Sequence, residues 1–193
     1  MFTGFNVSTR LWIGDYCYGR SFSELAGAAK GIKRLGVIRA DVDNLGQAFV
    51  KGFEGSNGDR CYVGFSRSAT FSRKMSMFFK LHINYILGSG SYCLDGELKY
   101  PARNALIVYS GGDDLFIVGP WNEIIEAAVD INDALKKFSQ GTLSISAGIG
   151  IFPEKFPVKA MAAQTGDLED FSKTLEGKNA VTLFDNTGRY NWD

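Results

Sequence analysis

The sequence contains little cysteine and histidine and has no excess of either charge. Its 193 residues include three cysteines, Cys17, Cys61 and Cys93, and one histidine, His82. No cysteine has another cysteine or a histidine close by in the sequence, so we expect free thiols in a reducing cytosol and no structural zinc. Lys plus Arg and Asp plus Glu number 21 each. This balance argues against bulk electrostatic binding of nucleic acid but allows a local basic patch.

Long apolar runs are also missing. No stretch of 18 apolar residues occurs, and the N-terminus has no apolar segment typical of a secretory signal. The sequence therefore predicts a soluble, cytoplasmic protein with no membrane contact. Apolar residues still make up 45% of the chain, which is enough for a substantial core. We expect an N-terminal extension, residues 1–30, that packs on one domain spanning 31–193.

A Gly-Gly-Asp-Asp tetrapeptide between two apolar runs is the strongest functional signal. Within Val108–Val118, the residues Gly111, Gly112, Asp113 and Asp114 are typical of a tight β-hairpin with adjacent carboxylates at its tip. Glycines permit the sharp turn and let a ligand approach the backbone. Adjacent carboxylates repel each other unless a cation lies between them, and Mg²⁺ is the ion they would share with a nucleotide phosphate. Taken alone, the tetrapeptide fits equally well a hairpin with solvated acids.

A second acidic motif ends the apolar run that begins at Leu35. Asp41 and Asp43 close the run, and the strand-stopping residues Asn44 and Gly46 follow. The two aspartates share one face if the strand continues as far as Asp43. Acids at a strand end beside a hairpin tip can bind two divalent ions. Two such ions, about 3.5–4 Å apart, activate an attacking hydroxyl and neutralise a leaving pyrophosphate. Taken alone, Asp41 and Asp43 are also consistent with solvated acids at a strand end. Together with the Gly-Gly-Asp-Asp hairpin they predict a site for metal ions and a nucleotide.

Apolar periodicity predicts the remaining elements. Helical spacing occurs at 66–87, 121–138 and 158–173, and Ser21 with Glu24 forms a capping box for a short helix. Strand patterns occur at 9–15, 33–43, in both arms of the hairpin within 104–118, at 143–151 and at 179–184. Residues 52–64 are typical of a loop, and 91–101 of an irregular hairpin.

The order of these elements predicts an α+β domain. It is a βαββαβ order with an added C-terminal helix and strand, which indicates an antiparallel sheet with helices on one face, the ferredoxin-like layout of nucleotidyltransferase palms. The first strand and the central hairpin are neighbours in that layout. We therefore expect Asp41 to lie close to Asp113 and Asp114.

Five blocks in a fixed order extend over nearly the whole chain. They are Gly31–Val37, Ala40–Gly46, Tyr109–Asp114, Ser144–Ile149 and Gly177–Val181. In this combination the chain resembles the second palm, or cyclase, domain of the large subunit of type III-A (Csm-type) CRISPR effector complexes. The same palm is similar to GGDEF diguanylate cyclases and, more remotely, to class III adenylyl cyclases.

The resemblance implies synthesis of cyclic oligoadenylate, a second messenger, from ATP when the complex binds target RNA. The 3′-hydroxyl of one ATP attacks the α-phosphate of another, and pyrophosphate leaves. Asp41, Asp113 and Asp114 would hold two Mg²⁺ or Mn²⁺ ions, with Asp113 and Asp114 as the catalytic pair.

The resemblance also implies the nucleotide contacts. The backbone around Asn44 to Gly46 would face the triphosphate, and Lys178 would neutralise the γ-phosphate. Lys173 is a second candidate, although its spacing to Gly177 departs from the cyclase pattern by one residue. The implied nucleotide-binding set is Asp41, Asn44, Leu45, Gly46, Ser110, Gly111, Gly112 and Lys178.

The resemblance covers one part of the family's large subunit. We expect as partners the first palm, which supplies half of the two-ATP pocket, the helical domains of the same subunit, and the other type III subunits with crRNA and target RNA. Without a His-Asp dyad, cleavage of single-stranded DNA is not expected of this chain.

Two alternatives remain at this level. One is a diguanylate-cyclase-like enzyme using GTP, because the sequence does not show base choice. The other is a non-catalytic palm scaffold in a ribonucleoprotein, against which the retention of every expected acid argues. His82, on a segment rich in Phe, is expected to pack in the core rather than act as a ligand or base.

Overall fold

The computed structural model describes residues 13–19, 21–54, 63–96 and 102–192. Its strands are β1 (Leu35–Val42), β2 (Leu106–Gly111), β3 (Asp114–Pro120), β4 (Ile145–Phe152), β5 (Ala180–Leu183) and β6 (Arg189–Asn191). Its helices are α1 (Phe22–Gly27), α2 (Leu45–Lys51), α3 (Phe65–Met77), α4 (Ile83–Gly88), α5 (Trp121–Ser139) and α6 (Val158–Ser172), and a π-helical segment, η1 (Phe78–His82), joins α3 to α4. Within these residues the strands form one sheet in the order β2-β3-β1-β4-β5-β6.

β1 lies inside the sheet, and it is buried except at Arg39 and Asp41, which are partly exposed. It pairs antiparallel with β3 on one side and with β4 on the other. The register sets Asp41 opposite Asp114 of β3 and Ser146 of β4. The expectation that the first strand lies beside the hairpin is therefore confirmed.

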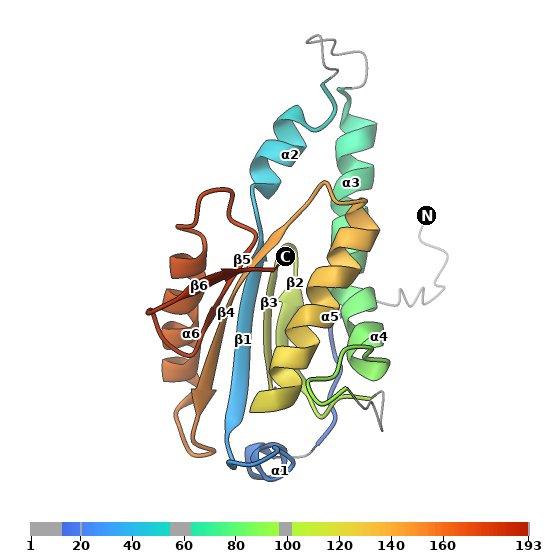
Figure 1. The fold of residues 1–193 in the computed structure, drawn as a ribbon. Coiled ribbons are helices and arrows are strands. Elements are labelled where there is room, and N and C mark those ends of the chain that lie inside the picture. The colour runs from blue at the N-terminus through green and yellow to red at the C-terminus, as the bar shows by residue number, and fades with distance from the viewer. Residues whose placement is uncertain (1–12, 20, 55–62, 97–101, 193) are drawn as a thin grey trace, which may run out of the picture.

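Helices cover both faces of the sheet (Figure 1). Ile38 of β1 belongs to the larger core with α3, α4 and α5, whereas Val37 faces the opposite way and packs in a second core with Met161 of α6. Since side chains alternate along a strand, Arg39 and Asp41 share the α6 face with Val37. The sheet is mixed, because β5 pairs parallel to β4 after α6. The prediction of an entirely antiparallel sheet is therefore wrong at β5. The prediction of helices on one face is also wrong, because α6 covers the other face.

Several local predictions need correction. The elements α2 and β6 were not predicted: both are short, at seven and three residues, and neither has a buried residue. The strand predicted at 9–15 is absent from residues 13–15, and residues 9–12 lie outside the described residues. The irregular hairpin predicted at 91–101 has no strand in residues 91–96, and residues 97–101 lie outside the described residues. So do residues 55–62 of the predicted loop. The capping box is confirmed, since the Ser21 hydroxyl accepts a hydrogen bond from the Glu24 amide.

The segment 13–18 lies along the outer edge of β2. Cys17 forms a bridge with Leu106, and the Tyr16 carbonyl accepts from the Ile107 amide at 2.9 Å. The side chain of Asn84 on α4 accepts from the Tyr16 amide at 3.2 Å. The division of the chain at residue 30 remains a prediction. No helix within the described ranges has both the length and the apolarity needed to cross a membrane.

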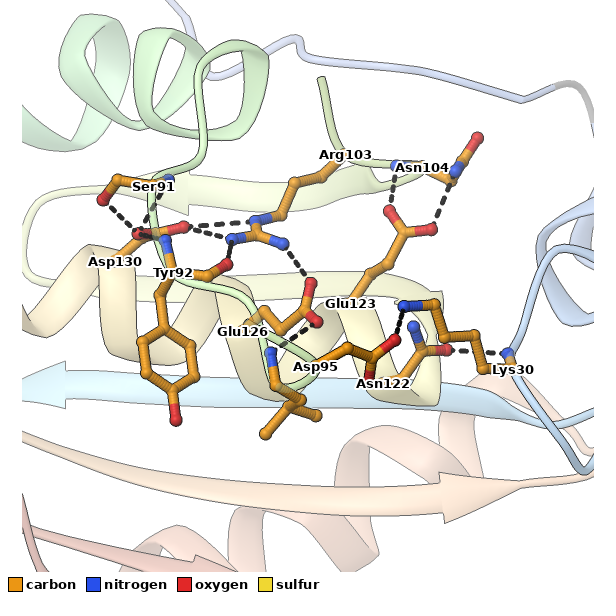
Figure 2. Close-up of polar contacts among 11 residues, drawn as sticks. Lys30, Ser91, Tyr92, Asp95, Arg103, Asn104, Asn122, Glu123, Glu126 and Asp130 are labelled. Carbon is orange, nitrogen blue, oxygen red and sulfur yellow. Dashed lines mark hydrogen bonds and ion pairs between the residues drawn. The ribbon is translucent and has the colours of Figure 1, made fainter. Parts of the chain in front are cut away.

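A buried ion network joins the loop after α4 to α5 (Figure 2). Arg103, only 3% exposed, forms ion pairs with Glu126 and Asp130 of α5 and donates to the Tyr92 carbonyl at 2.6 Å. Asp130 also accepts from the amides of Ser91 and Tyr92, at 3.1 and 2.9 Å. The network therefore satisfies loop amides and buried charges together.

Candidate active site

The tip of the β2–β3 hairpin is a two-residue turn. β2 ends at Gly111 and β3 begins at Asp114, so Gly112 and Asp113 are the central residues. Gly112 has φ of +70°, and no other atom lies within 4 Å of where its Cβ would be. The glycine is therefore needed for its backbone angle rather than for space, as in a type II′ hairpin turn. The predicted hairpin is confirmed.

Asp41 and Asp114 meet across the β1–β3 pair. They are directly opposite in the register, and Asp113 adjoins them at the turn. Burial, followed by the charges of Asp41 and Asp113, raises the pKa of Asp114, although Arg39 and Lys173 act in the opposite direction. The predicted proximity of Asp41 to the hairpin acids is confirmed. The site concentrates negative charge at a cost that a cation would relieve.

Lys173, just after α6, supplies a cation at this cluster. Its Nζ lies 2.6 Å from Asp41 Oδ2 and 2.6 Å from Glu169 Oε1. Although burial alone lowers the pKa of Lys173, the hydrogen bonds and charges of Asp41 and Glu169 raise it above its ordinary value. Lys173, the second candidate for binding the γ-phosphate, is thus paired with Asp41, a proposed metal ligand.

Sequence reasoning missed Glu169 and Arg39. The carboxylate of Glu169 is buried between Lys173 and Arg39, and its Oε2 forms an ion pair with Arg39 Nε at 3.0 Å. Burial raises the pKa of Glu169, although Lys173 and Arg39 oppose that rise. Two spacings could have revealed these residues: Arg39 precedes Asp41 by one strand repeat, and Glu169 precedes Lys173 by one helical turn.

Asn44 and Lys178 come together at the end of β1. Lys178 Nζ donates to Asn44 Oδ1 at 2.9 Å, although 134 residues separate them in the sequence. Both residues have left-handed backbone angles, with φ of 54° and 57°. Leu45 and Gly46 form the first turn of α2. The structure thus unites two predicted nucleotide-binding residues, while their contact with a nucleotide remains a prediction.

The hydroxyl of Ser110 serves the fold. It donates to the carbonyl of Phe79 in η1, so its proton is not available to a ligand at the turn. His82 lies near the rings of Phe78 and Phe138, with centroid distances of 6.1 and 5.9 Å. His82 is nevertheless exposed, so the expectation that it packs in the core is wrong: the histidine lies beside the Phe78 and Phe138 rings at the surface.

Asp43 is committed to hydrogen bonds at the start of β4 and with Asn179. It is 4% exposed, and its carboxylate accepts from the hydroxyls of Ser144 and Ser146, each at 2.7 Å, and from the amide of Asn179 at 3.0 Å. β1 ends before it, at Val42. Asp43 therefore joins β4 and the residue before β5 to the end of β1, and one of its donors, Ser146, is the residue opposite Asp41 in the register.

Replacing Asp43 with Ala is expected to lower the free energy of unfolding by about 2–4 kcal/mol, because one buried and two partly buried donors lose their acceptor. Urea denaturation measures the change. Asp43→Asn keeps one acceptor oxygen and should lose less. Unchanged stability combined with lost metal-dependent nucleotide binding would instead identify Asp43 as a ligand.

The carboxylates of Asp41, Asp113 and Asp114 are suitable ligands for a divalent ion, but their side chains are not arranged around a common metal position. In the part of the chain that the structure describes, no three His, Cys, Asp or Glu side chains are grouped to hold a metal. Asp41, Asp113 and Asp114 are the hard oxygen donors that Mg²⁺ and Mn²⁺ prefer. Burial, together with the charges of Asp41 and Asp113, raises the pKa of Asp114. A metal at Asp41 would have to share it with Lys173 or displace Lys173 from it.

A cleft of about 560 Å³ opens beside Asn44, between α2, α3 and the segment that follows α5. Phe53 and Phe71 line it, together with the buried Asp43 and with Lys51. It combines aromatic faces with polar groups, as small-molecule sites do. The cleft was not predicted, because α2, which forms one of its walls, was not predicted.

Comparison with known proteins agrees with this geometry. Residues 34–182 match the model of the family described as Cas10/Cmr2, second palm domain. The chain is 47% identical over 194 residues to the CRISPR system single-strand-specific deoxyribonuclease Cas10/Csm1 (subtype III-A) of Mycobacterium tuberculosis, covering 100% of this chain and 24% of the relative. It is 40% identical over 191 residues to the protein of the same name from Streptococcus thermophilus, covering 96% of this chain and 23% of the relative.

Solved structures show the same likeness. A Csm1–Csm4 cassette in complex with one ATP matches with a TM-score of 0.74 and 32% identity, over 94% of this chain and 27% of that chain. The cassette in complex with cA4 matches with a TM-score of 0.76 and 31% identity, over the same shares. The chain spans about a quarter of the length of its curated relatives. On the family match and these identities, the chain belongs to the Cas10/Cmr2 second palm domain family, and its homologues are Cas10/Csm1 large subunits of subtype III-A.

Proposed function

We propose that this chain is the cyclase palm of a type III-A CRISPR large subunit, which joins ATP into cyclic oligoadenylate. The observation that carries the proposal is the register of Asp41 against Asp114 beside Asp113, because nucleotidyl transfer with two divalent ions needs clustered carboxylates. The cassettes bound to ATP and cA4 support the choice of nucleotide.

We also infer that the fold is a ferredoxin-like palm of the GGDEF and nucleotide-cyclase type. The order β2-β3-β1-β4, with antiparallel pairing throughout these four strands, supports that assignment. The segments α3 to α4 and α5 connect them, and α6 with β5 is the added C-terminal unit.

Each proposed role is assigned to a residue whose surroundings suit it. Asp41, Asp113 and Asp114 would hold Mg²⁺ or Mn²⁺, which when bound activates the 3′-hydroxyl and neutralises the leaving pyrophosphate. Lys178, held beside Asn44, would neutralise the γ-phosphate. Gly112 would leave the backbone of the turn open to a phosphate, because it is exposed and nothing lies within 4 Å of where its Cβ would be; Gly111, also proposed to contact the nucleotide, is buried beside Tyr109 and Lys80.

The whole subunit's activity would need parts beyond this domain. We propose as partners the first palm and helical domains of the same subunit, and the other type III subunits with crRNA and target RNA. The matching cassettes pair Csm1 with Csm4, which supports an assembled complex. We place this complex in the cytoplasm, away from membranes.

Titration calorimetry tests the proposal. The full chain should bind ATP only with Mg²⁺ or Mn²⁺, and the Asp113→Asn, Asp114→Asn double variant should lose that binding while keeping its fold. GTP in place of ATP reports base selectivity. If the native chain with its partner palm binds neither nucleotide, or if the double variant binds ATP as the native chain does, the proposed site is wrong.

A further inference from the structure

The Asp41 carboxylate already has a cation against it. Lys173 Nζ lies 2.6 Å from Asp41 Oδ2 and, at an equal distance, from Oε1 of Glu169. Asp41 is partly exposed at 23%, whereas the Glu169 side chain is 4% exposed. A lysine held by one carboxylate alone would exchange readily with solvent, but this ammonium is held between two.

Glu169 is itself fixed in place. Arg39 Nε lies 3.0 Å from its second oxygen, so a cation stands on either side of the buried carboxylate. Two glycines allow this close packing of α6. A Cβ on Gly148 of β4 would come within 2.5 Å of the Glu169 amide nitrogen, and one on Gly166 within 2.9 Å of the Arg39 guanidinium. At Gly148, helix and strand therefore pack at a separation that a side chain would not permit, whereas at Gly166 the neighbour is the flexible end of Arg39.

The charges show what the lysine does. Asp41, Asp113, Asp114 and Glu169 are four acids, and Arg39 and Lys173 are two cations among them. Lys173 neutralises the acid on β1, while Asp114 still has a raised pKa from its acidic neighbours and burial. A divalent ion entering beside Asp41 would meet the positive charge of an ammonium that Glu169 holds there.

We propose that Lys173, positioned by Glu169 and Arg39, is an internal cation that competes with divalent metal for Asp41. This inference rests on the proposed function, because the competing metal is the one that nucleotidyl transfer requires. The phosphates of a bound nucleotide are the anion that draws Lys173 away from Asp41. Metal therefore binds well only together with nucleotide, and Arg39 and Glu169 act as positioning residues for that exchange.

Mn²⁺ binding to the full chain without nucleotide tests the competition. The measurement is the loss of the free Mn²⁺ signal in electron paramagnetic resonance. Lys173→Met, which keeps the length of the side chain and removes its charge, should bind Mn²⁺ roughly tenfold more tightly or better, since a unit charge within about 4–6 Å shifts such equilibria by one to three powers of ten. Lys159→Met, which removes an exposed lysine in the first turn of α6, is the matched control and should not change the affinity.

A double-mutant cycle tests the positioning role. If Glu169 acts by holding Lys173, the gain in Mn²⁺ affinity from Lys173→Met should be smaller in a Glu169→Gln background, by roughly threefold or more. A general loss of structure would not produce this dependence, and circular dichroism verifies that the variants fold. Equal gains in both backgrounds would overturn the role of Glu169.

The outcomes separate this inference from the proposed function. Tighter Mn²⁺ binding by Lys173→Met than by the native chain supports the competition. Equal Mn²⁺ affinity of both, with metal-dependent ATP binding intact, overturns the competition and leaves the proposed function standing. Absence of Mn²⁺ binding from both chains, together with absence of metal-dependent ATP binding in the presence of the partner palm, overturns both.

Discussion

Asp114→Asn is expected to abolish product formation and, at the same time, to make the chain more stable. Loss of a carboxylate ligand should lower the rate of cyclic oligoadenylate synthesis roughly a thousandfold or more, because about 4 kcal/mol of transition-state stabilisation is lost with it. Yet ionised Asp114 is unfavourable in the folded chain, since burial and the charges of Asp41 and Asp113 raise its pKa. An amide of the same size removes that repulsion.

The pH dependence of this stability gain has a definite sign. An acid whose pKa is raised on folding binds its proton more tightly in the folded state, so native stability falls as pH rises from the ordinary value of 3.8 through the raised one. Above both values the native chain bears the full cost, and Asp114→Asn should melt roughly 1–4 °C higher at neutral pH. Below both values Asp114 is protonated in either state, and the advantage should disappear.

Product chromatography of the reconstituted complex and calorimetric melting of the chain measure the two effects. Asp133→Asn, which removes an exposed acid on α5, is the control and should change neither. Undiminished synthesis by Asp114→Asn would remove this acid from catalysis. A lower melting temperature at neutral pH would show that the raised pKa does not reflect a cost to the fold.

Arg103→Met is expected to produce the largest loss of stability. Removal of the guanidinium leaves Glu126 and Asp130 buried without their cation, at a cost of about 3–5 kcal/mol, or a fall in Tm of roughly 6–20 °C for a domain of this size. Arg103→Lys should recover only part of the loss, because a single ammonium cannot reproduce the forked contacts to both acids and the Tyr92 carbonyl.

The same network offers an internal control. Adding Glu126→Gln and Asp130→Asn to Arg103→Met removes every charge from the network, so the triple variant should be more stable than Arg103→Met alone. Thermal denaturation of the native chain, Arg103→Met and the triple variant measures the three stabilities. A triple variant less stable than the single one would show that the acids stabilise the chain through the loop amides of Ser91 and Tyr92 rather than through Arg103.

The hairpin and its partner strand could be predicted because their signals are local. A glycine with positive φ between two apolar runs identifies the turn, and the strand pattern before Asp41 identifies β1. Element order then makes these strands neighbours, and the register of Asp41 against Asp114 follows that expectation.

The rest of the site depends on tertiary packing. Lys173 reaches Asp41 across 132 residues, and it does so only because Gly148 lets α6 pack directly on β4. Neither the depth of that packing nor the rotation of the helix is encoded in a local pattern. The role of Asp43 depends on tertiary packing in the same way, since the three donors that it accepts from lie more than 100 residues away in the sequence.

The interior position of β1 also has a consequence for synthesis of the chain. β1 is synthesised before its neighbours β3 and β4, which follow much later in the sequence. At roughly 5–20 residues per second, the nascent chain carries this apolar strand for several seconds without a partner on either side. A chain interrupted before Phe152 therefore keeps an open apolar edge, which favours aggregation. Completion of β4 is the step that both protects the nascent protein and encloses Asp41 between its two neighbours.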